Sequence, residues 1–340
     1  MQTVRLGKTE IVTNKNGFGA LPIQRISDEE AVKIVRRAYD AGVTFFDTAR
    51  FYTDSEHKLG LALSDVRDKV YIASKTAAVK PEDFWKDLET TLTNLKTDHL
   101  DIYQFHNPSF CPKPRDESGV YECMLEAKKQ GKILHIGITN HRLKIAHEAI
   151  ESGLYETLQF PFCYLATEDD TALVTACKQK DMGFIAMKAL SGGLITNSAA
   201  AYAFEAQFDN VLPIWGLQRM KELEEFLSYM ENPPVMTDEI RAVIEKDRSE
   251  LMGEFCRGCG YCMPCPAGIE INNCARMSLM IRRAPSDAQL TPQMQAKMMK
   301  IEECLHCNQC MSKCPYHLDT PKLLEKNLKD YKEILAGKAY

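Results

Sequence analysis

The sequence lacks the features that direct a chain into or across a membrane. No apolar run among its 340 residues approaches the roughly 20 that a membrane-spanning helix needs. The first residues, Met1 to Arg5, lead into polar sequence without the apolar core of a signal peptide. Net charge is also small, −5 at pH 7, and there is no low-complexity tract. A cytoplasmic protein is therefore expected, with neither nucleic acid nor a membrane as a partner.

The sequence also lacks the glycine-rich phosphate loop of open, doubly wound nucleotide-binding sheets. Its first candidate, Gly17-Phe18-Gly19-Ala20, has neither the third glycine nor the acidic partner further on. Instead, apolar strand-like runs alternate with amphipathic stretches. The eight candidate strands are Phe18–Ile23, Thr44–Thr48, Val70–Lys75, Leu100–His106, Ile133–Thr139, Leu158–Phe162, Phe184–Leu190 and Val211–Gly216. Eight strand–helix units predict an α/β fold closed into a (β/α)8 TIM barrel rather than an open sheet.

Local signals place helices between the strands and mark where the barrel ends. Ser27 and Glu30 form a capping box that predicts a helix over Asp28–Ala41. Asn232-Pro233-Pro234 interrupts the alternation, and a charged helix is expected just after it. We therefore expect a barrel over residues 1–231, a linker helix within 232–254, and a small, mostly helical cysteine-rich domain over 255–340.

Polar residues stand at the ends of three successive candidate strands. Asp47 ends the second strand and Tyr52 follows it, Lys75 ends the third, and His106 ends the fourth. In a TIM barrel the carboxyl ends of the strands form one rim, where catalytic residues sit. One such residue alone is weak evidence, because a buried Asp–Lys pair is often only structural. Four of them together predict an active site.

The four side chains suit the reduction of a carbonyl group. The reaction needs a proton donor at the developing alkoxide, and a free tyrosine, with a pKa of about 10, is a poor acid near neutrality. An adjacent ammonium lowers the pKa of a tyrosine, and a carboxylate can hold that ammonium in place. A histidine can hydrogen-bond the substrate oxygen and orient it.

These residues stand in stretches that resemble a known family. The run Phe46-Asp47-Thr48-Ala49-Arg50-Phe51-Tyr52, with Ser55-Glu56 and Leu59-Gly60 after it, resembles the signature of the aldo-keto reductases, and the segments around Lys75 and His106 resemble its next two blocks. The resemblance implies an NAD(P)-dependent oxidoreductase that reduces a carbonyl or oxidises an alcohol. It also implies a catalytic tetrad of Asp47, Tyr52, Lys75 and His106, with Tyr52 as the general acid or base.

The resemblance further implies that NADP or NAD binds across the mouth of the barrel. Thr139 replaces the family's serine in the block that holds the nicotinamide amide, and Met187 stands where many members have a tyrosine stacked on the nicotinamide. Arg219 is either a contact to a 2′-phosphate or a surface charge, so NADPH and NADH both stay candidates. The implied nucleotide contacts are Thr139, Asn140, Gln159, Met187, Leu190, Gly192, Gly216 and Arg219.

The thirteen cysteines are unevenly spread, and nine of them lie between Cys256 and Cys314. In a chain without an export signal, clustered cysteines indicate metal rather than disulfides. The second cluster, Cys304-x2-Cys307-x2-Cys310-x3-Cys314-Pro315, has the spacing of a bacterial ferredoxin motif. The first, Cys256-x2-Cys259-x2-Cys262-x2-Cys265-Pro266, is one residue shorter in its last gap.

In two-cluster ferredoxins, three cysteines of each motif bind one cluster and the fourth binds the other. That rule assigns Cys256, Cys259, Cys262 and Cys314 to one 4Fe–4S cluster, and Cys304, Cys307, Cys310 and Cys265 to a second. The short gap before Cys265 leaves a single cluster as an alternative. Zinc is the competing metal, since four-cysteine zinc sites also use paired C-x2-C spacing, but three cysteines at successive threes followed by Cys-Pro favour iron–sulfur.

Aldo-keto reductases with such a ferredoxin-like segment form a subgroup that this chain resembles throughout its length. The leading hypothesis is a carbonyl or alcohol oxidoreductase whose clusters relay single electrons or are structural. Its candidate partners are a small-molecule substrate and an electron-transfer protein. The alternative is a nucleotide-sensing regulatory or redox-sensor module that docks on a partner through the cluster domain.

Overall fold

The computed structural model describes residues 2–251, 255–283 and 289–338. Met1, residues 252–254 of the expected linker, and residues 284–288 and 339–340 of the expected cysteine-rich domain lie outside the described residues. The chain divides into two compact units, Met1–Ala189 with Ala199–Met236, and Leu190–Ser198 with Thr237–Tyr340. Among the described residues, none of the helices has both the length and the apolar character that a membrane span requires.

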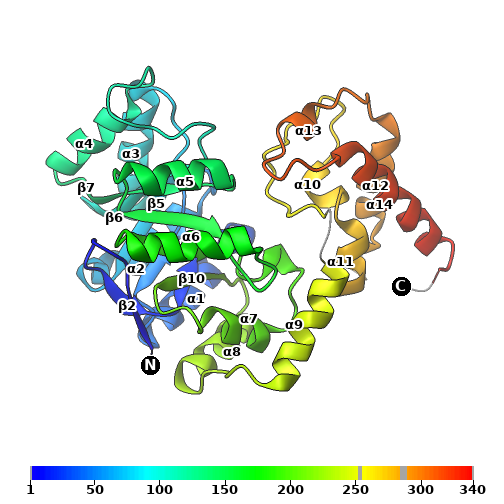
Figure 1. Cartoon of the computed structure of the whole chain (residues 1–340), viewed down its shortest axis with the longest axis horizontal. Coiled ribbons are helices and arrows are strands. Elements are labelled where there is room, and N and C mark those ends of the chain that lie inside the picture. Colours follow the sequence, from blue (N-terminus) through cyan, green and yellow to red (C-terminus); the bar gives the residue numbers. More distant parts are fainter. Residues whose placement is uncertain (1, 252–254, 284–288, 339–340) are drawn as a thin grey trace. The chain divides into compact units, whose positions relative to one another are not determined.

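A closed barrel of eight parallel strands forms the centre of the first unit (Figure 1). The strands follow one another around the barrel in chain order, and the last pairs with the first. They are β3 (Gly17–Gly19), β4 (Phe45–Asp47), β5 (Tyr71–Thr76), β6 (Leu100–His106), β7 (Ile133–Thr139), β8 (Thr157–Pro161), β9 (Gly183–Met187) and β10 (Val211–Gly216). The predicted (β/α)8 barrel is confirmed.

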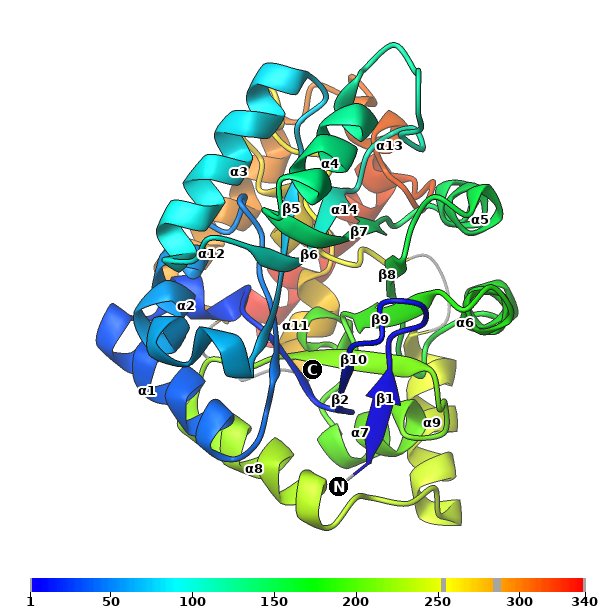
Figure 2. The same ribbon diagram turned by 90° about the vertical axis from the view of Figure 1, so that its left-hand side faces the viewer.

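Helices surround these strands, as Figure 2 shows. They are α1 (Asp28–Asp40), α2 (Ser55–Leu63), α3 (Pro81–Leu95), α4 (Val120–Lys129), α5 (Leu143–Ser152), α6 (Glu168–Gln179), α7 (Ser198–Glu205) and α8 (Met220–Glu231). The capping box ahead of α1 is present, since the Ser27 side chain accepts from Glu30 N and the Glu30 side chain accepts from Ser27 N. Short 3-10 helices also occur, η1 (Pro22–Arg25), η2 (Ser64–Lys69) and η3 (Ser191–Gly193).

Two expected strands extend three or more residues beyond the observed carboxyl ends. The first was expected to reach Ile23, but β3 ends at Gly19 and Pro22 begins η1, because proline has a fixed φ and no N–H for a strand ladder. The seventh was expected to reach Leu190, but β9 ends at Met187. Lys188 follows with φ +59°, a left-handed conformation that no strand continues.

The alternation of side chains along the strands positions the site. An antiparallel hairpin of β1 (Thr3–Arg5) and β2 (Val12–Asn14) contributes Val4 and Leu6 to a buried cluster with strand residues such as Phe45 and Ile102. Side chains two residues further along a strand point to the same side. Asp47 therefore follows Phe45 on the inward face of β4, and Gln104 follows Ile102 on that of β6.

The second unit is helical and has its own core. Its helices are α9 (Asp238–Leu251), α10 (Ile271–Cys274), α11 (Met277–Arg283), α12 (Pro292–Met299), α13 (Gln309–Ser312) and α14 (Thr320–Leu335), with η5 (Lys300–Glu303). The long α14 packs against α10, α11, α12 and α13. Asn327 of α14 stabilises this packing, because it donates to Ala275 O at 3.1 Å and accepts from Ser278 N at 2.8 Å.

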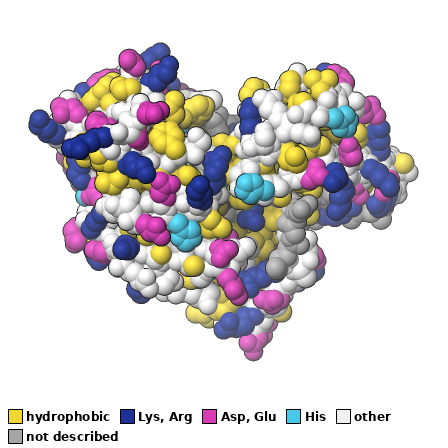
Figure 3. Space-filling model, turned by 45° about the horizontal axis from the view of Figure 1, so that its top comes forward, with side chains coloured by type: hydrophobic (Ala, Val, Ile, Leu, Met, Phe, Trp, Pro, Cys, Tyr) yellow, Lys and Arg dark blue, Asp and Glu magenta, His cyan; other side chains and the backbone are white. Residues whose placement is uncertain are grey.

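On the face drawn in Figure 3, acidic and basic side chains are interspersed rather than gathered by sign. That pattern agrees with the small net charge of −5, the difference between 42 basic and 47 acidic residues. The charges of this face therefore form no field of one sign that would attract an oppositely charged partner.

Candidate active site

Four polar side chains gather where three neighbouring strands end. Asp47 is the last residue of β4, Lys75 lies near the end of β5, and His106 ends β6. The parallel register places Asp47 opposite Ala73 and Lys75 opposite Gln104. Tyr52 stands in the loop between β4 and α2. The strand ends that the sequence singled out therefore lie at one rim of the barrel.

Asp47 and Lys75 form a buried ion pair. Lys75 Nζ lies 2.6 Å from Asp47 Oδ1, and the two side chains are only 1% and 3% exposed. Lys75 Nζ also donates to Thr48 O at 2.6 Å. Burial lowers the pKa of Lys75 and raises that of Asp47, while the opposite charge of each partner opposes the shift of the other. Removal of either partner would leave an unpaired buried charge, which is costly.

Tyr52 and His106 lie beside this ion pair. Lys75 Nζ lies 5.3 Å from the centroid of the Tyr52 ring, and the Tyr52 and His106 rings meet edge to face with centroids 5.8 Å apart. Burial and the charge of Lys75 lower the pKa of His106 to about 3, so its imidazole is neutral near pH 7. Within the described part of the chain, its enclosed Nδ1 has no hydrogen-bond partner.

Hydrogen bonds close the loop that carries Tyr52. The Thr48 and Ser55 hydroxyl oxygens lie 2.9 Å apart, which joins the two ends of the loop. Tyr52 N donates to Ala49 O at 2.9 Å, and Ser55 N donates to Tyr52 O at 2.7 Å. The backbone of Tyr52 is therefore fixed on both sides, which restricts where its phenol can lie.

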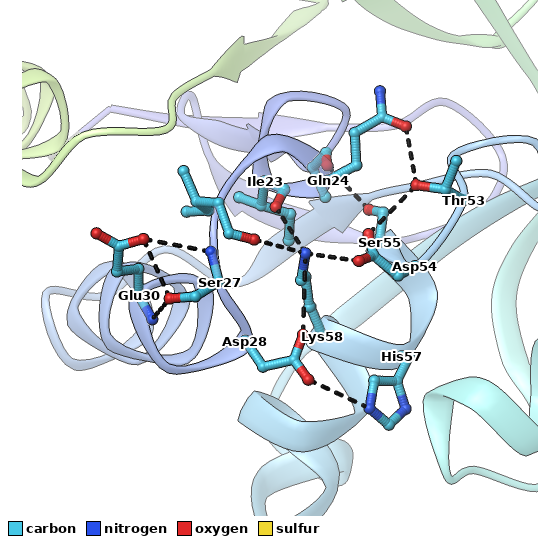
Figure 4. A network of polar contacts seen from close by, with 12 residues as sticks. Ile23, Gln24, Ser27, Asp28, Glu30, Thr53, Asp54, Ser55, His57 and Lys58 are labelled. Atoms are coloured by element: carbon cyan, nitrogen blue, oxygen red, sulfur yellow. Dashed lines mark hydrogen bonds and ion pairs between the residues drawn. The ribbon is translucent and has the colours of Figure 1, made fainter.

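Lys58 of α2 holds the later part of this loop (Figure 4). Its ammonium donates to Asp54 Oδ2 at 2.7 Å, to Ile26 O at 2.8 Å and to Ile23 O at 3.2 Å. The side chain of Lys58 is only 2% exposed, so these oxygen acceptors replace the water that a charged group otherwise needs. Lys58 thus joins the Tyr52 loop to the segment that follows β3.

Gln104 is a site residue that the sequence analysis did not identify. Its amide nitrogen lies 2.8 Å from Gln159 Oε1 and 3.4 Å from Asp47 Oδ2, and Gln159 Nε2 lies 3.4 Å from Asp47 Oδ1. Two buried amides therefore surround the carboxylate of Asp47. The sequence indicates this only by spacing: Gln104 stands two residues before His106 and therefore lies on the same face of β6.

Three of the expected nucleotide contacts lie together on adjoining strands. Thr139 at the end of β7 pairs with Gln159 on β8, and Thr139 Oγ1 donates to Met187 Sδ of β9 at 3.7 Å. Asn140 is already engaged in local structure. Its side chain donates to Pro108 O at 2.9 Å and accepts from Arg142 N at 2.9 Å, which shapes the turn into α5.

The remaining expected contacts are more dispersed. Gly216 ends β10 and is exposed. Arg219, just before α8, has a side chain 68% exposed and lies 3.4 Å from Glu222 Oε1, so its charge has an intramolecular partner. Leu190 and Gly192 belong to the second unit, in which Arg276 Nη2 donates to Gly192 O at 2.6 Å.

The eight cysteines of the two motifs line two cavities within the second unit. One cavity is lined by Cys256, Cys259, Cys262 and Cys314, together with Arg257 and Tyr316. The other is lined by Cys262, Cys265, Cys304, Cys307 and Cys310. Each ligand set expected from the ferredoxin spacing thus borders a single cavity, and Cys262 borders both.

The donors around these cavities fit iron–sulfur clusters. All thirteen cysteines are free thiols, so the eight motif cysteines are available as ligands. Soft thiolate ligands are the usual ligands of such clusters. Among the described residues, no three His, Cys, Asp or Glu side chains converge as they would on a single metal ion. Cys274 is fully buried in α10 and lines neither cavity, which fits a core residue rather than a ligand.

Two parts of the sequence match known protein families. Residues 15–201, more than half of the chain, match the Aldo/keto reductase family. Residues 255–319 match the 4Fe-4S dicluster domain.

Individual relatives agree with this assignment. L-galactose dehydrogenase of Arabidopsis thaliana is 29% identical over 211 residues, which cover 56% of this chain and 66% of the relative. Methylglyoxal reductase DkgB of Escherichia coli O157:H7 is 35% identical over 137 residues, 37% of this chain and 48% of the relative. The chain thus spans between about half and two thirds of the length of these two relatives.

Solved structures share the barrel. An aldo-keto reductase from Klebsiella pneumoniae in complex with NADPH has a TM-score of 0.61 at 21% identity, over 72% of this chain and 94% of that one. Aldo-keto reductase AKR11C1 from Bacillus halodurans has a TM-score of 0.64 at 18% identity, over 73% and 96%. At these identities the likeness concerns the fold. Together with the family match over residues 15–201, it shows that this chain belongs to the aldo/keto reductase family, with a 4Fe-4S dicluster domain after its barrel.

Proposed function

We propose that the barrel is an NAD(P)-dependent oxidoreductase that reduces a carbonyl group, or oxidises an alcohol, by hydride transfer. The observation that carries the proposal is the buried Asp47–Lys75 ion pair at 2.6 Å beside Tyr52 and His106. A bound nicotinamide nucleotide would supply the hydride, and this chain's own residues would manage the proton.

Tyr52 is the proposed proton donor. In reduction, its hydroxyl gives a proton to the carbonyl oxygen while the carbonyl carbon gains the hydride, and in oxidation the proton returns to the phenolate. The Lys75 ammonium, 5.3 Å from the ring centroid, would stabilise that phenolate in a site of low dielectric. Asp47 keeps the ammonium in place and charged, because the ion pair opposes the effect of burial on Lys75.

His106 is proposed to orient the substrate. A neutral imidazole with its proton on Nε2 would donate a hydrogen bond to the carbonyl oxygen and would not compete with Tyr52 as the acid. The pKa of about 3 keeps His106 uncharged at any pH near neutrality, so this donor role would not change with pH there.

The nucleotide is proposed to bind beside this site. Thr139, Gln159 and Met187 adjoin one another on β7, β8 and β9, which supports a shared contact to the nicotinamide. Asn140, Leu190, Gly192, Gly216 and Arg219 complete the proposed set. The complex of the Klebsiella pneumoniae reductase with NADPH supports this class of cofactor.

Two 4Fe–4S clusters are proposed for the second unit. Cys256, Cys259, Cys262 and Cys314 would hold one of them, and Cys265, Cys304, Cys307 and Cys310 the other. Bound clusters would supply one-electron transfer to an electron-transfer protein, a structural role, or both. Cys307 is exposed, whereas Cys256 and Cys310 are buried. The second cluster would thus have the ligand most accessible to a partner.

The proposed activity is tested with anaerobically purified protein and a panel of aldehydes and alcohols. We expect consumption of NADPH or NADH that depends on the carbonyl compound, and a comparison of the two nucleotides shows which of them the barrel uses. A complete lack of turnover across the panel with both nucleotides would contradict the proposal.

The expected domain boundaries lead to a prediction about truncation. All eight barrel strands precede Pro233, so a chain ending there should still fold, because a barrel of this size buries its own core. We expect it to bind nicotinamide nucleotide, because the proposed contacts Thr139, Gln159 and Met187 lie on strands that it keeps. Circular dichroism and nucleotide titration measure both properties. An insoluble truncated barrel would show that the boundary near Pro233 is misplaced.

A further inference from the structure

A second buried carboxylate, Glu56 of α2, lies close to the proposed active site. Its side chain is only 1% exposed. Oε1 accepts from Ser74 Oγ and Thr91 Oγ1, both at 2.8 Å, and Oε2 accepts from Arg50 Nη1 and Asn94 Nδ2, both at 3.3 Å. A single carboxylate thus joins the loop after β4, the strand β5 and the helix α3 to α2.

A close helix contact permits this arrangement. Gly60 stands one turn after Glu56 on α2, and a Cβ atom added to it would lie 2.1 Å from Asn94 O of α3. Only glycine allows the two helices to approach so closely. Since residues four apart share a helix face, the same approach brings Thr91 and Asn94 within reach of the Glu56 carboxylate.

Arg50 connects Glu56 to the loop that carries Tyr52. Arg50 stands two residues before Tyr52, and its backbone N donates to Lys75 O at 3.0 Å. Its guanidinium donates to the Glu56 carboxylate, and the Arg50 side chain is 28% exposed. Thr48 to Ser55 are therefore held by two side chains of α2, by Glu56 through Arg50 and by Lys58 through Asp54.

Glu56 also acts on the charge of Lys75. It accepts a hydrogen bond from Ser74, the residue before Lys75, and its negative charge raises the pKa of Lys75 against the lowering effect of burial. The titratable groups around Lys75 are Asp47 from β4, Tyr52 from the following loop, Glu56 from α2 and His106 from β6. The ammonium therefore has two carboxylates nearby, and only Asp47 contacts it directly.

We propose that Glu56 is a positioning residue for Tyr52, which it holds in place through its hydrogen bonds with Arg50 and with Ser74, the residue before Lys75. This inference rests on the proposed role of Tyr52 as the proton donor. Loss of an ordinary buried carboxylate would lower stability without changing proton transfer, whereas loss of Glu56 should change proton transfer as well.

Glu56→Gln removes the charge and keeps the size of the side chain. We expect kcat for aldehyde reduction to fall by up to about a hundredfold, the scale of a small misplacement of a reacting group, with little change in the Kd for NADPH. Loss of the negative charge of Glu56 disfavours the Lys75 ammonium, so the charge that stabilises the Tyr52 phenolate is lost at lower pH. The decline of the reduction rate at high pH should therefore move to lower pH.

Arg50→Met tests the same link from its partly exposed end. It leaves the buried Glu56 carboxylate without the charge of Arg50, so its unfolding temperature is measured beside kcat. The matched control is Asp101→Asn at the opposite end of β6. Asp101 is a buried carboxylate that accepts from Arg67 Nη2 at 2.7 Å and from Ile72 N at 2.8 Å, so its neutralisation breaks a comparable ion pair away from the site. We expect Asp101→Asn to lower the unfolding temperature but to keep the wild-type kcat and pH profile.

Two kinetic results would overturn the inference. One is a folded Glu56→Gln or Arg50→Met protein with the kcat and pH profile of the wild type. The other is an equal loss of kcat in Asp101→Asn, which would make the effect one of general stability. If the wild type itself reduces no aldehyde, the proposed function fails, and hydrogen exchange then tests the positioning of Tyr52 in place of kinetics. Hydrogen exchange of residues 48–55 should be faster in Glu56→Gln than in Asp101→Asn, and equal rates would refute the link.

Discussion

Tyr52→Phe is expected to reduce kcat for carbonyl reduction by at least about a hundredfold, the scale of a lost general acid. The substitution removes the hydroxyl that is proposed to carry the proton. It keeps the ring that lies beside Lys75 and His106, so the packing of the site should persist. The Kd for NADPH should stay within about twofold, because an effect confined to the transition state leaves ground-state binding unchanged. Steady-state kinetics and a fluorescence titration of the nucleotide measure the two quantities.

Tyr121→Phe is the matched control for this prediction. Tyr121 of α4 is a buried tyrosine whose hydroxyl donates to Leu154 O at 2.8 Å, so the control removes one hydrogen bond and leaves the site intact. We expect wild-type turnover from it. Turnover by Tyr52→Phe equal to that of Tyr121→Phe would remove Tyr52 from the mechanism. Lys75→Met should also lose turnover, but it leaves the Asp47 carboxylate buried and unpaired and so lowers stability as well.

Loss of the clusters is expected to unfold the second unit and to leave the barrel folded. The core of this unit contains Cys256 and Cys310, and Cys262, Cys304 and Cys314 pack against it. Its helices α10 and α13 have only four residues each, too few to persist without tertiary support. When a preformed site does not exist in the unfolded chain, the free energy of metal binding becomes free energy of folding.

Iron analysis and hydrogen exchange measure this effect. We expect about eight iron atoms per chain in anaerobically prepared, brown protein. Removal of iron by oxidation and a chelator should then abolish hydrogen-exchange protection in residues 255–283 and 289–338, while β3–β10 keep theirs. Persistence of that protection without iron would contradict a structural role for the clusters.

Single-cysteine variants separate the two proposed clusters. Cys256→Ala and Cys304→Ala should each retain about four iron atoms, since each removes a ligand of one cluster only. Cys274→Ala is the control, because Cys274 is buried in the same unit and lines neither cavity, and it should retain all the iron. About four iron atoms in the wild type would indicate a single cluster, and colourless protein loaded with zinc would contradict the iron–sulfur assignment.

The sequence was informative where its signal was local and periodic. The strands Leu100–His106, Ile133–Thr139 and Val211–Gly216 have the bounds that their apolar runs predicted. Asp47 and His106 were identifiable because a polar residue that ends an apolar run is visible in the sequence itself. The two strand ends that were wrong by more than one residue depend on single backbone angles, at Pro22 and at Lys188, which an apolar run does not reveal.

Residues whose partners are distant in the sequence were harder to find. Glu56 was part of the recognised signature, but its ties to Ser74, Thr91 and Asn94 arise from the packing of α2 on α3 at Gly60. No periodic pattern contains such a contact, because it depends on how two helices approach in space. The same holds for the amides around Asp47, which come from different strands.

The most direct test of the proposed function follows deuterium from the nucleotide to the product. The protein is given an aldehyde and NADPH that carries deuterium at the transferable position of the nicotinamide C4, and the alcohol is analysed by mass spectrometry. Hydride transfer with Tyr52 as the proton donor predicts one deuterium on the former carbonyl carbon for each NADPH oxidised, with a product hydroxyl proton that comes from exchangeable sites. The Tyr52→Phe protein should form almost none of this product. Alcohol without deuterium, or equal labelled product from both proteins, would contradict the account.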